Sequence, residues 1–521
     1  MQERRYPVGI QTFAKIREGN YLYIDKTDLI YNIAHSYNAV FLSRPRRFGK
    51  SLLVSTLKEY FSGNRDLFNG LKIAELEKDW TEYPVLSFNM SSLKRETVEE
   101  IKQGIGVKLD EYEAKYGITE KTSNINDRLT ILIKRAHEKT GRKVVILIDE
   151  YDAPLLNVLY EDNMNEVRQT MRSFYSPIKD CDEHIQFAFM TGITKFSQLS
   201  IFSELNNLAK ISMDDDYSAI CGITQSEIDT CMKEDIERLA AKLKLTYEET
   251  HAQLKDMYDG YHFSKNSEDI YNPFSLLSCF AARDIRNFWF DSATPSFLIK
   301  SMKKFNFRIN ETERLECQEE QFDVSATDLE SAIPLLYQSG YLTIKGFEPR
   351  FKKYFLDMPN DEVRYGLMKS LIPSVFCNSD QKNDFWIDKF VTDLEKNNIE
   401  SFMERLEALV MSVPYATGDK AELVTEQSVQ NAFFLIFNLM GQFTRAEVHT
   451  LKGRSDCIVE TADTVYLFEF KLSKNGTAAQ ALAQIDDKSY ACTYAPSDKK
   501  VVKLGVAFDS ASRTFDQWVT G

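Results

Sequence analysis

The chain of 521 residues is 43% hydrophobic and 12% aromatic, which is typical of a folded protein with several domains and excludes a disordered one. With 78 acidic and 64 basic residues it has a formal net charge of −14, which argues against a surface coated with basic side chains for nonspecific nucleic-acid binding. No run of about 18 apolar residues predicts a membrane-spanning helix.

The cysteines and the first residues bear on the compartment. The eight cysteines and six histidines are scattered, with no Cys-x-x-Cys pair, so we expect reduced thiols and no structural zinc site. Residues 1–7 lack the apolar core of a signal peptide. These features favour a cytoplasmic protein that does not associate with membranes.

The first motif is a loop between an apolar run at residues 39–42 and a helix-like segment at residues 52–57. Strand, loop and helix in this order, with Gly-Lys-Ser before the helix, are typical of a loop that binds nucleotide phosphates through backbone N–H groups and a lysine. Lys50 would contact the terminal phosphates and Ser51 would bind Mg²⁺. Arg44 stands where the common pattern has its first glycine. The predicted nucleotide contacts are Arg44, Pro45, Arg46, Arg47, Phe48, Gly49, Lys50 and Ser51.

A second motif is the apolar run of residues 144–148, which ends in Asp149 and Glu150. A run that is apolar on both faces predicts a buried parallel strand, and carboxylates at its C-terminal end lie where α/β sheets bind ligands. Asp149 would hold Mg²⁺, and Glu150 would orient or deprotonate the attacking water. The alternative is an ordinary strand followed by a polar turn.

Residues 84–90 and 185–192 predict two further strands of the same sheet. Thr191, at the end of the second, would sense the γ-phosphate; a strand-capping threonine is the alternative. Arg168 and Arg172 follow the Asp149 motif and are candidates for an arginine finger.

Three regions follow from the pattern along the chain. Residues 1–215 alternate strand-like and helix-like segments, as expected for an α/β NTPase core with a parallel sheet. Residues 216–400 are mostly helical in pattern, and residues 335–344 predict a helix, a glycine cap and a strand of a winged-helix-like lid. Most aromatic residues of this region are expected in the core. Residues 401–521 form the third region.

The third region predicts a β-hairpin with a carboxylate pair. If residues 461–464 form the turn, Asp456 lies opposite Glu469, and Lys471 emerges on the same face. Two acids this close repel each other unless a cation intervenes, and Mg²⁺ prefers one or two carboxylates with water and phosphate oxygens. We therefore predict that Asp456 and Glu469 bind a metal and that Lys471 assists phosphodiester cleavage. A surface hairpin with a Glu–Lys ladder is the alternative.

Two helical segments flank this hairpin. Residues 425–435 predict a helix capped by Thr425, on which Glu426 is a weaker candidate for a third carboxylate. Residues 478–490 predict another helix, whose Gln484 and Tyr490 would border the substrate path. Residues 501–508 predict the last strand of the sheet.

Taken together, these motifs resemble bacterial proteins with an N-terminal AAA-ATPase-like domain and a C-terminal PD-(D/E)XK nuclease-superfamily domain. The resemblance covers nearly the whole chain and includes residues 21–27, 44–51, 149–152, 203–208, 258–261 and 271–273. It implies an α-β-β-β-α restriction-endonuclease-like core at the C-terminus, with Asp456, Glu469 and Lys471 matching the active-site triad. Arg44 is usual for this family.

The leading hypothesis is an ATP-driven, Mg²⁺-dependent nuclease that acts on nucleic acid, DNA in the first instance. A homo-oligomer or a protein partner is compatible with the sequence. The alternative hypothesis is a nucleotide-switched sensor or scaffold whose C-terminal domain binds without cleaving. Intact Asp456, Glu469 and Lys471 favour the enzyme, whereas the acidic net charge favours the scaffold.

Overall fold

The computed structural model describes residues 5–93, 97–119, 122–194, 208–292, 296–305, 315–323, 331–375, 387–412, 421–441, 445–451, 454–487, 499–509, 512 and 514–521. The chain forms two compact units, one of Met1–Phe307 with Glu313–Val363 and one that holds Arg364–Gly521. The predicted boundaries near residues 215 and 400 stay predictions. The predicted roles of Tyr490 and of most of the 203–208 signature fall outside the described residues.

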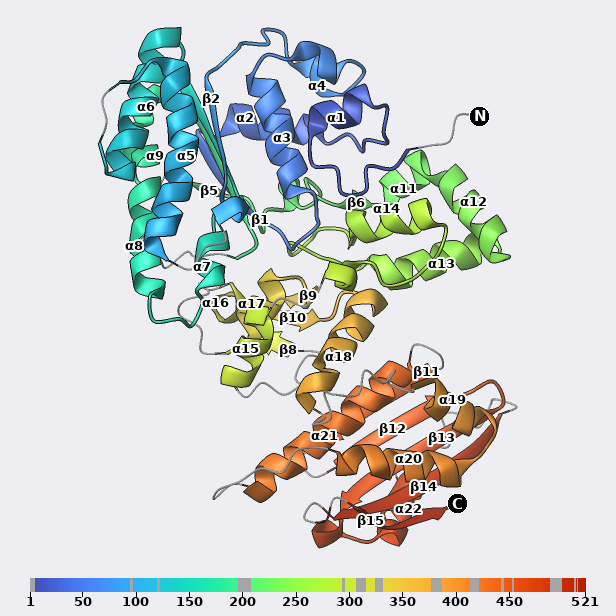
Figure 1. The fold of residues 1–521 in the computed structure, drawn as a ribbon. Helices are drawn as coiled ribbons and strands as arrows, with labels where there is room; N and C mark the ends of the chain where they lie inside the picture. The colour runs from blue at the N-terminus through green and yellow to red at the C-terminus, as the bar shows by residue number, and fades with distance from the viewer. Residues whose placement is uncertain are drawn as a thin grey trace. The chain divides into compact units, whose positions relative to one another are not determined.

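The first unit is built on a five-stranded parallel sheet in the order β2-β3-β4-β1-β5. Every position of β1 and β3 is buried, as the apolar runs predicted, because helices cover both faces of the sheet (Figure 1). The strands are β1 (Ala39–Ser43), β2 (Val85–Asn89), β3 (Val144–Asp149), β4 (Ile185–Gly192) and β5 (Ala209–Lys210). The helices are α1 (Phe13–Glu18), α2 (Thr27–Ser36), α3 (Lys50–Phe61), α4 (Ile73–Leu76), α5 (Val98–Tyr116), α6 (Ile125–Thr140), α7 (Ala153–Asn157), α8 (Met164–Tyr175) and α9 (Pro177–Asp180).

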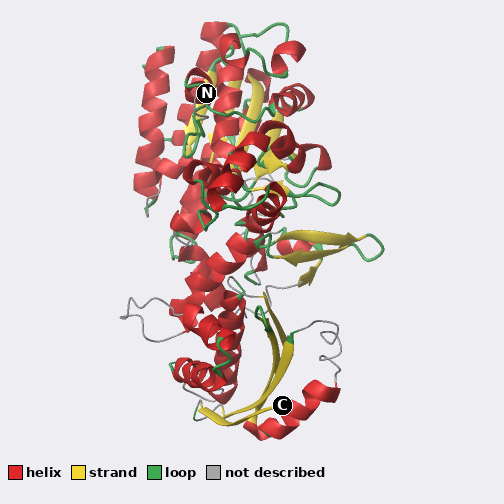
Figure 2. Ribbon diagram, turned by 90° about the vertical axis from the view of Figure 1, so that its right-hand side faces the viewer, coloured by secondary structure: helices red, strands yellow, loops and turns green. Residues whose placement is uncertain are grey.

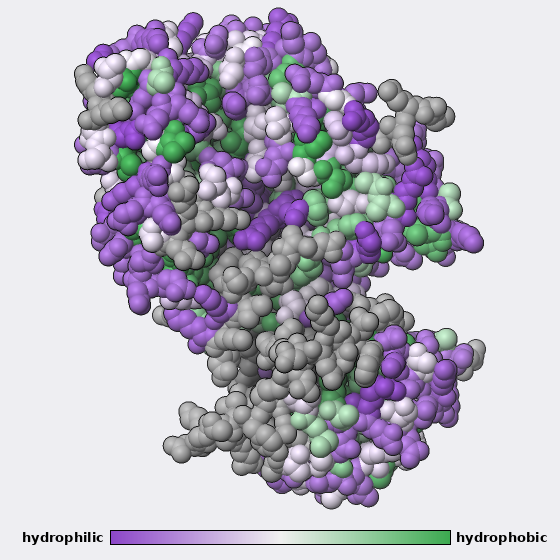
Figure 3. Space-filling view, viewed as in Figure 1, coloured by the Kyte–Doolittle hydropathy of each residue, from purple (hydrophilic) through white to green (hydrophobic). Residues whose placement is uncertain are grey.

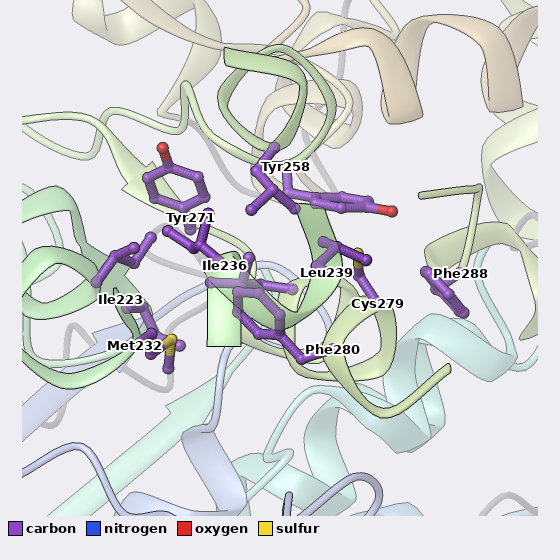
Figure 4. Close-up of a cluster of buried hydrophobic side chains, with 12 residues drawn as sticks. Ile223, Met232, Ile236, Leu239, Tyr258, Tyr271, Cys279, Phe280 and Phe288 are labelled. Atoms are coloured by element: carbon purple, nitrogen blue, oxygen red, sulfur yellow. The ribbon is translucent and has the colours of Figure 1, made fainter. Parts of the chain in front are cut away.

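A helical region follows the sheet, as predicted. Thr224 and Thr246 each form a capping box, with Glu227 and Glu249 respectively, which fixes where two of its helices begin. An apolar cluster of Ile236, Tyr258, Phe280 and their neighbours holds these helices together (Figure 4). The elements are β6 (Ile223–Thr224), α11 (Gln225–Cys231), α12 (Lys233–Leu243), α13 (Tyr247–Tyr258), β7 (Ile270–Tyr271), α14 (Pro273–Ala282) and α15 (Ser296–Lys304).

A three-stranded antiparallel sheet in the order β8-β10-β9 completes the first unit. The predicted helix, glycine and strand are all present as α17, Gly340 and β9. Gly340 has a φ of 87°, and a Cβ there would lie 2.6 Å from Cβ of Pro45 in the phosphate loop, so a larger residue would collide with that loop. The elements are β8 (Leu315–Cys317), α16 (Glu319–Phe322), α17 (Ile333–Gln338), β9 (Thr343–Glu348) and β10 (Lys353–Asp357). Helix α18 (Asp361–Val375) contains the boundary between the units.

The second unit is a mixed sheet in the order β11-β12-β13-β14-β15, in which only β13 and β14 run parallel. Figure 2 shows this curved sheet with helices on both sides. On one face of the sheet, Phe468 and Phe470 pack against aromatic rings of α20 and α21. On the other face, Leu467 packs against Ile485 of α22. The elements are α19 (Ile387–Glu395), α20 (Ile399–Met411), α21 (Ala421–Met440), β11 (Arg445–Leu451), β12 (Arg454–Glu460), β13 (Thr464–Leu472), α22 (Ala478–Asp487), β14 (Lys500–Asp509) and β15 (Thr514–Thr520).

Two local predictions in this unit are wrong. The run at residues 501–508 is a strand, β14, but it is not the last one, because β15 follows it and pairs with it along the edge of the sheet. Helix α21 begins at Ala421, so Thr425 lies inside the helix and does not cap it. The four preceding residues have a strong enough helical pattern to extend the helix past the polar threonine. Among the described residues, none of the helices has the length and apolar character needed to cross a membrane. The face seen in Figure 3 is largely hydrophilic, with scattered apolar side chains.

Candidate functional site

The phosphate loop lies between β1 and α3, at the C-terminal edge of the sheet. Gly49 has a φ of 94°, is exposed, and has no atom within 4 Å of the position its Cβ would occupy, so the loop backbone there is open to a ligand. Lys50 is only 5% exposed and donates hydrogen bonds to the carbonyl oxygens of Arg44 (3.0 Å) and Pro45 (2.9 Å). The lysine ammonium is therefore folded back under its own loop.

The other loop side chains divide into two groups. Arg46 and Arg47 are exposed, and the Arg47 guanidinium lies 3.9 Å from the centre of the Phe274 ring. Phe48 is buried and packs edge-on against Tyr261 (4.7 Å) and Phe263 (5.3 Å). The loop is thus held by the aromatic stretch that follows α13, a segment more than 200 residues away in the sequence.

Arg44 points away from the open side of the loop. It is 2% exposed, and its guanidinium donates to the carbonyl oxygens of Ser43 (2.9 Å), Ser212 (2.7 Å), Tyr217 (3.1 Å) and Ser218 (3.3 Å). It also lies 4.2 Å from the centre of the Phe263 ring. Burial lowers the pKa of Arg44 to about 10. A glycine, which the common pattern has at this position, has no side chain to make these bonds. Arg44 therefore fixes the start of the phosphate loop to the neighbouring backbone.

Arg44→Ala should destabilise the first unit and loosen the loop. The substitution leaves four buried carbonyl oxygens without this donor, and we expect a loss of about 3 kcal/mol in the free energy of unfolding. Urea unfolding monitored by circular dichroism measures this loss. Arg46→Ala, at an exposed neighbour, is the control and should unfold within about 0.5 kcal/mol of the unchanged protein.

Asp149 lies at the end of β3 and faces the start of α3. Burial raises its pKa, while a hydrogen bond from Ser51 and the charge of Lys50 oppose the shift. Its Oδ1 atom is buried and accepts no hydrogen bond from the described residues. A carboxylate oxygen left open beside a serine hydroxyl fits a divalent cation, which would restore the missing ligand. The predicted metal residues Ser51 and Asp149 are therefore brought together.

No group of three or more His, Cys, Asp or Glu side chains with metal-binding geometry occurs among the residues that the structure describes. This does not conflict with Mg²⁺ at Asp149, since Mg²⁺ takes one or two carboxylates and fills its other positions with water and phosphate oxygens. Glu150 follows with a φ of 50°, a left-handed conformation that is strained for a glutamate and turns the chain sharply at the sheet edge.

Asp152 ends the 149–152 stretch of the family resemblance, but the sequence reasoning gave it no role. It is 1% exposed, and its Oδ2 accepts hydrogen bonds from the backbone N–H groups of Ile193 (3.0 Å) and Thr194 (2.6 Å) and from the Thr194 hydroxyl (2.7 Å). It thereby joins the turn after β3 to the end of β4. Its position three residues after Asp149 in one polar turn was the available signal.

Thr191 donates from Oγ1 to the carbonyl oxygen of Leu42 (2.7 Å) and is fully buried. This contact joins β4 to β1, and its role toward a γ-phosphate stays a prediction. Arg168 and Arg172 both lie on α8, where the Arg168 side chain donates to Asn165. An arginine-finger role for either stays a prediction too.

Asp259 is a second buried acid that the sequence did not single out. It is 3% exposed, and its pKa is raised to about 6, mainly by burial. The nearby charge of Asp269 also raises the pKa, whereas the charges of Lys255 and Lys345 lower it. Its Oδ1 accepts no hydrogen bond from the part of the chain that is described. The adjoining Gly260 has no room for a Cβ, which would lie 2.2 Å from the Pro359 carbonyl oxygen.

Asp259→Asn should stabilise the protein at neutral pH. An aspartate whose pKa is higher in the folded than in the unfolded state destabilises the fold once the pH rises above the unfolded value, near about 4. The gain of the variant over the unchanged protein should therefore be absent below about pH 4, grow toward pH 6 and level off at about 3 kcal/mol, the value that the linkage relation gives for a pKa of about 6 in the folded state and about 4 in the unfolded state. Thermal unfolding across this pH range measures it.

In the second unit the predicted register is confirmed. Strand β12 pairs antiparallel with β13, with Asp456 opposite Glu469, Ile458 opposite Leu467 and Glu460 opposite Val465. Thr461 and Thr464 close the turn through a 2.8 Å backbone hydrogen bond. Opposed residues of an antiparallel pair have Cβ atoms about 5 Å apart, so positions 456 and 469 are neighbours.

Glu469 is fully buried, at 0% exposure, which excludes the surface hairpin that the sequence left open. It lies two residues beyond Leu467 on β13, so both side chains project to the same side of the sheet, the face that α22 covers. Lys471, two residues on, is half-buried and donates from Nζ to the carbonyl oxygen of Gln480 on α22 (3.3 Å). Glu469 and Lys471 therefore share the α22 side of the sheet.

Helix α22 adds Gln484 to this side. Its Nε2 is buried and donates to no acceptor among the described residues. Gln484 lies one helical turn beyond Gln480, whose backbone carbonyl oxygen accepts the hydrogen bond from Lys471. Glu426 lies on α21, so the sequence placed it on a helix correctly. Its part in the site stays a prediction.

Comparison with known proteins agrees with this architecture. Residues 7–202 match the family model described as "Predicted AAA-ATPase", and residues 424–518 match the model of the PD-(D/E)XK nuclease superfamily. The chain is also 34% identical over 533 residues to a protein of Azotobacter chroococcum mcd 1 described as "Uncharacterized protein in vnfD 5'region", covering 99% of this chain and 98% of that relative. The chain belongs to the family of proteins that carry a predicted AAA-ATPase domain followed by a PD-(D/E)XK nuclease-superfamily domain.

Proposed function

We propose that this protein binds and hydrolyses ATP and that it cleaves nucleic-acid phosphodiester bonds with the help of Mg²⁺. The observation that carries the nuclease part is the fully buried carboxylate of Glu469 opposite Asp456, with Lys471 two residues further on the same strand. Carboxylates at directly opposed positions of two paired strands lie close enough to share a cation, and carboxylate oxygens are ligands that Mg²⁺ prefers. A metal-dependent site accounts for an acidic pair at this place.

At the nucleotide centre, Lys50 would leave the carbonyl oxygens of Arg44 and Pro45 and contact the terminal phosphates. Ser51 and Asp149 are the residues that would hold Mg²⁺, since the open Oδ1 of Asp149 fits such a ligand. Glu150 would orient or deprotonate the attacking water. The bound metal would neutralise charge on the β- and γ-phosphates.

At the nuclease centre, Asp456 and Glu469 would hold the metal, which would stabilise charge on the scissile phosphate and lower the pKa of a bound water. Lys471 would position the attacking water or neutralise the phosphate. Gln484, with its buried and open amide nitrogen, would donate a hydrogen bond to the strand being cut. DNA is the substrate that we test first.

The test is a cleavage assay with Mg²⁺ or Mn²⁺ on single- and double-stranded DNA and RNA, with and without ATP, together with a measurement of phosphate release. We expect metal-dependent cleavage and ATP hydrolysis, and both should stop when EDTA removes the metal. A protein that hydrolyses ATP but cleaves none of these substrates would contradict the nuclease part. ATP affinity without phosphate release would contradict the ATPase part.

A nucleotide-switched scaffold is the second candidate, because the formal net charge of −14 opposes broad nucleic-acid binding. In that case the second unit would bind a partner without cleaving it. The same assay separates the two, since a scaffold would bind nucleic acid or protein in an ATP-dependent way and leave every phosphodiester intact.

A further inference from the structure

The turn between β9 and β10 exposes an aromatic side chain that lies between two basic residues. The two strands pair antiparallel up to Lys353 and Glu348, and the four turn residues between them, residues 349–352, are all exposed. Phe351 is 57% exposed, which makes it one of only five large hydrophobic side chains identified as exposed among the described residues. Figure 2 shows the hairpin projecting from the first unit with its turn at the outer end.

The base of the hairpin is anchored. Ile344, Tyr354 and Leu356 belong to a buried apolar cluster, in which the rings of Tyr354 and Phe322 lie 5.1 Å apart. Lys345 is tied down too, because its Nζ donates to the carbonyl oxygens of Gly260 (2.7 Å) and Pro359 (3.0 Å). The tip is therefore presented on a rigid support.

The tip is basic although the protein is acidic. Arg350 and Lys352 flank Phe351, and the Arg350 guanidinium lies 5.1 Å from the centre of the Phe351 ring. Two acids lie at the base of the turn. Glu348 accepts a hydrogen bond from the backbone N–H of Arg350 (3.0 Å), and Glu316 forms an ion pair with Lys353 (2.9 Å).

The backbone at Lys352 adds a separate observation. Its φ is 51°, in the left-handed region that glycine adopts without strain and other residues adopt at a cost of about 1 kcal/mol. A lysine at this position therefore lowers the stability of the turn while placing a cation at its tip. Strain of this kind is found at sites that bind ligands.

We propose that the tip of the β9–β10 hairpin docks into the major groove of duplex DNA, with Arg350 and Lys352 on phosphates and Phe351 against base edges. This rests on the proposed function, since it names how the nucleic acid is held. A two-stranded ribbon fits the major groove of B-form DNA, which is about 12 Å wide. The A-form major groove of duplex RNA is too narrow for it. A projecting tip also suits a groove better than it suits a single strand, which needs a concave platform.

The test measures DNA binding by fluorescence anisotropy in EDTA, where no cleavage occurs. The double variant Phe351→Ser/Lys352→Gly removes the ring and one cation and relieves the strained φ. We expect it to bind duplex DNA about tenfold more weakly than the unchanged protein. The slope of log affinity against log salt concentration should be smaller by about one, because one phosphate contact is lost. The variant should melt no earlier than the unchanged protein, since the strained φ is relieved.

The control is Lys102→Ala/Val107→Ser on α5, which removes one exposed lysine and one exposed apolar side chain elsewhere on the same unit. Val107 is 58% exposed, which matches Phe351 closely. We expect this control to bind DNA like the unchanged protein. Equal losses in both variants would overturn the inference, because the effect would then reflect charge in general.

Three further outcomes would overturn it. They are unchanged duplex binding by the hairpin variant, an equal loss on duplex RNA or single-stranded DNA, and a change in sedimentation without a change in DNA affinity, which would assign the tip to a second copy of the chain. The proposed function is tested by a different measurement, the cleavage of DNA by the unchanged protein. If the hairpin variant binds normally while the unchanged protein cleaves DNA with Mg²⁺, only the docking inference fails.

Discussion

Replacing Lys50 with alanine should weaken ATP binding about a hundredfold, an expected loss on the order of 3 kcal/mol. Lys50 is buried, and the charges of Glu150, Asp149 and Asp152 oppose the lowering of its pKa that burial causes. These carboxylates favour the charged form of Lys50, and in a nearly dry site the attraction between that charge and a phosphate is stronger than in water. Isothermal titration with ATP and with ADP measures the loss.

Lys58→Ala is the matched control for this prediction. Lys58 lies on the same helix α3 but is exposed, so its removal should leave ATP affinity unchanged. Because both proposed centres belong to one chain, we expect Lys50→Ala also to change the rate of DNA cleavage. An affinity for ATP within about twofold of the unchanged protein, a difference of about 0.4 kcal/mol, would contradict the phosphate role of Lys50.

Glu469→Gln should lower DNA cleavage by at least about a hundredfold and leave ATP binding unchanged. Loss of groups that only support metal ligands already costs about ten- to a hundredfold, and Glu469 would be a direct ligand. The amide has the same shape but no charge. Because the carboxylate is fully buried, the melting temperature shows whether the variant folds like the unchanged protein. Cleavage rates and melting temperature are measured together.

Asp463→Asn makes the same chemical change in the exposed turn of the same hairpin and should cleave at the normal rate. Asp456→Ala and Lys471→Ala should resemble Glu469→Gln, since the three residues would act on one phosphate. Normal cleavage by Asp456→Ala would exclude this catalytic assignment, whereas a joint loss of cleavage and of folding would show only that the hairpin is structural.

Periodicity predicted β1 to β4 of the parallel sheet and β12 to β14 of the mixed sheet, but not the edge strands β5, β11 and β15. The runs at residues 144–149 and 185–192 are apolar on both faces, and a strand covered by helices on both sides needs that pattern. The pairing of Asp456 with Glu469 followed from the turn length alone, because a side chain alternates sides at every residue of a strand. Thr425 was misjudged because a polar residue is only a weak signal for a helix start when helix-forming residues precede it.

The sequence by itself determined the local elements, the phosphate loop and the order of the two chemical centres along the chain. Only the tertiary structure showed that Arg44 turns inward to four carbonyl oxygens, that Asp152 joins β3 to β4, and that α22 buries Glu469. These depend on contacts between residues as far apart as 174 positions in the sequence, and periodicity reports only neighbours within one helix or strand. Burial, and with it the raised pKa of Asp152, is set by those distant contacts.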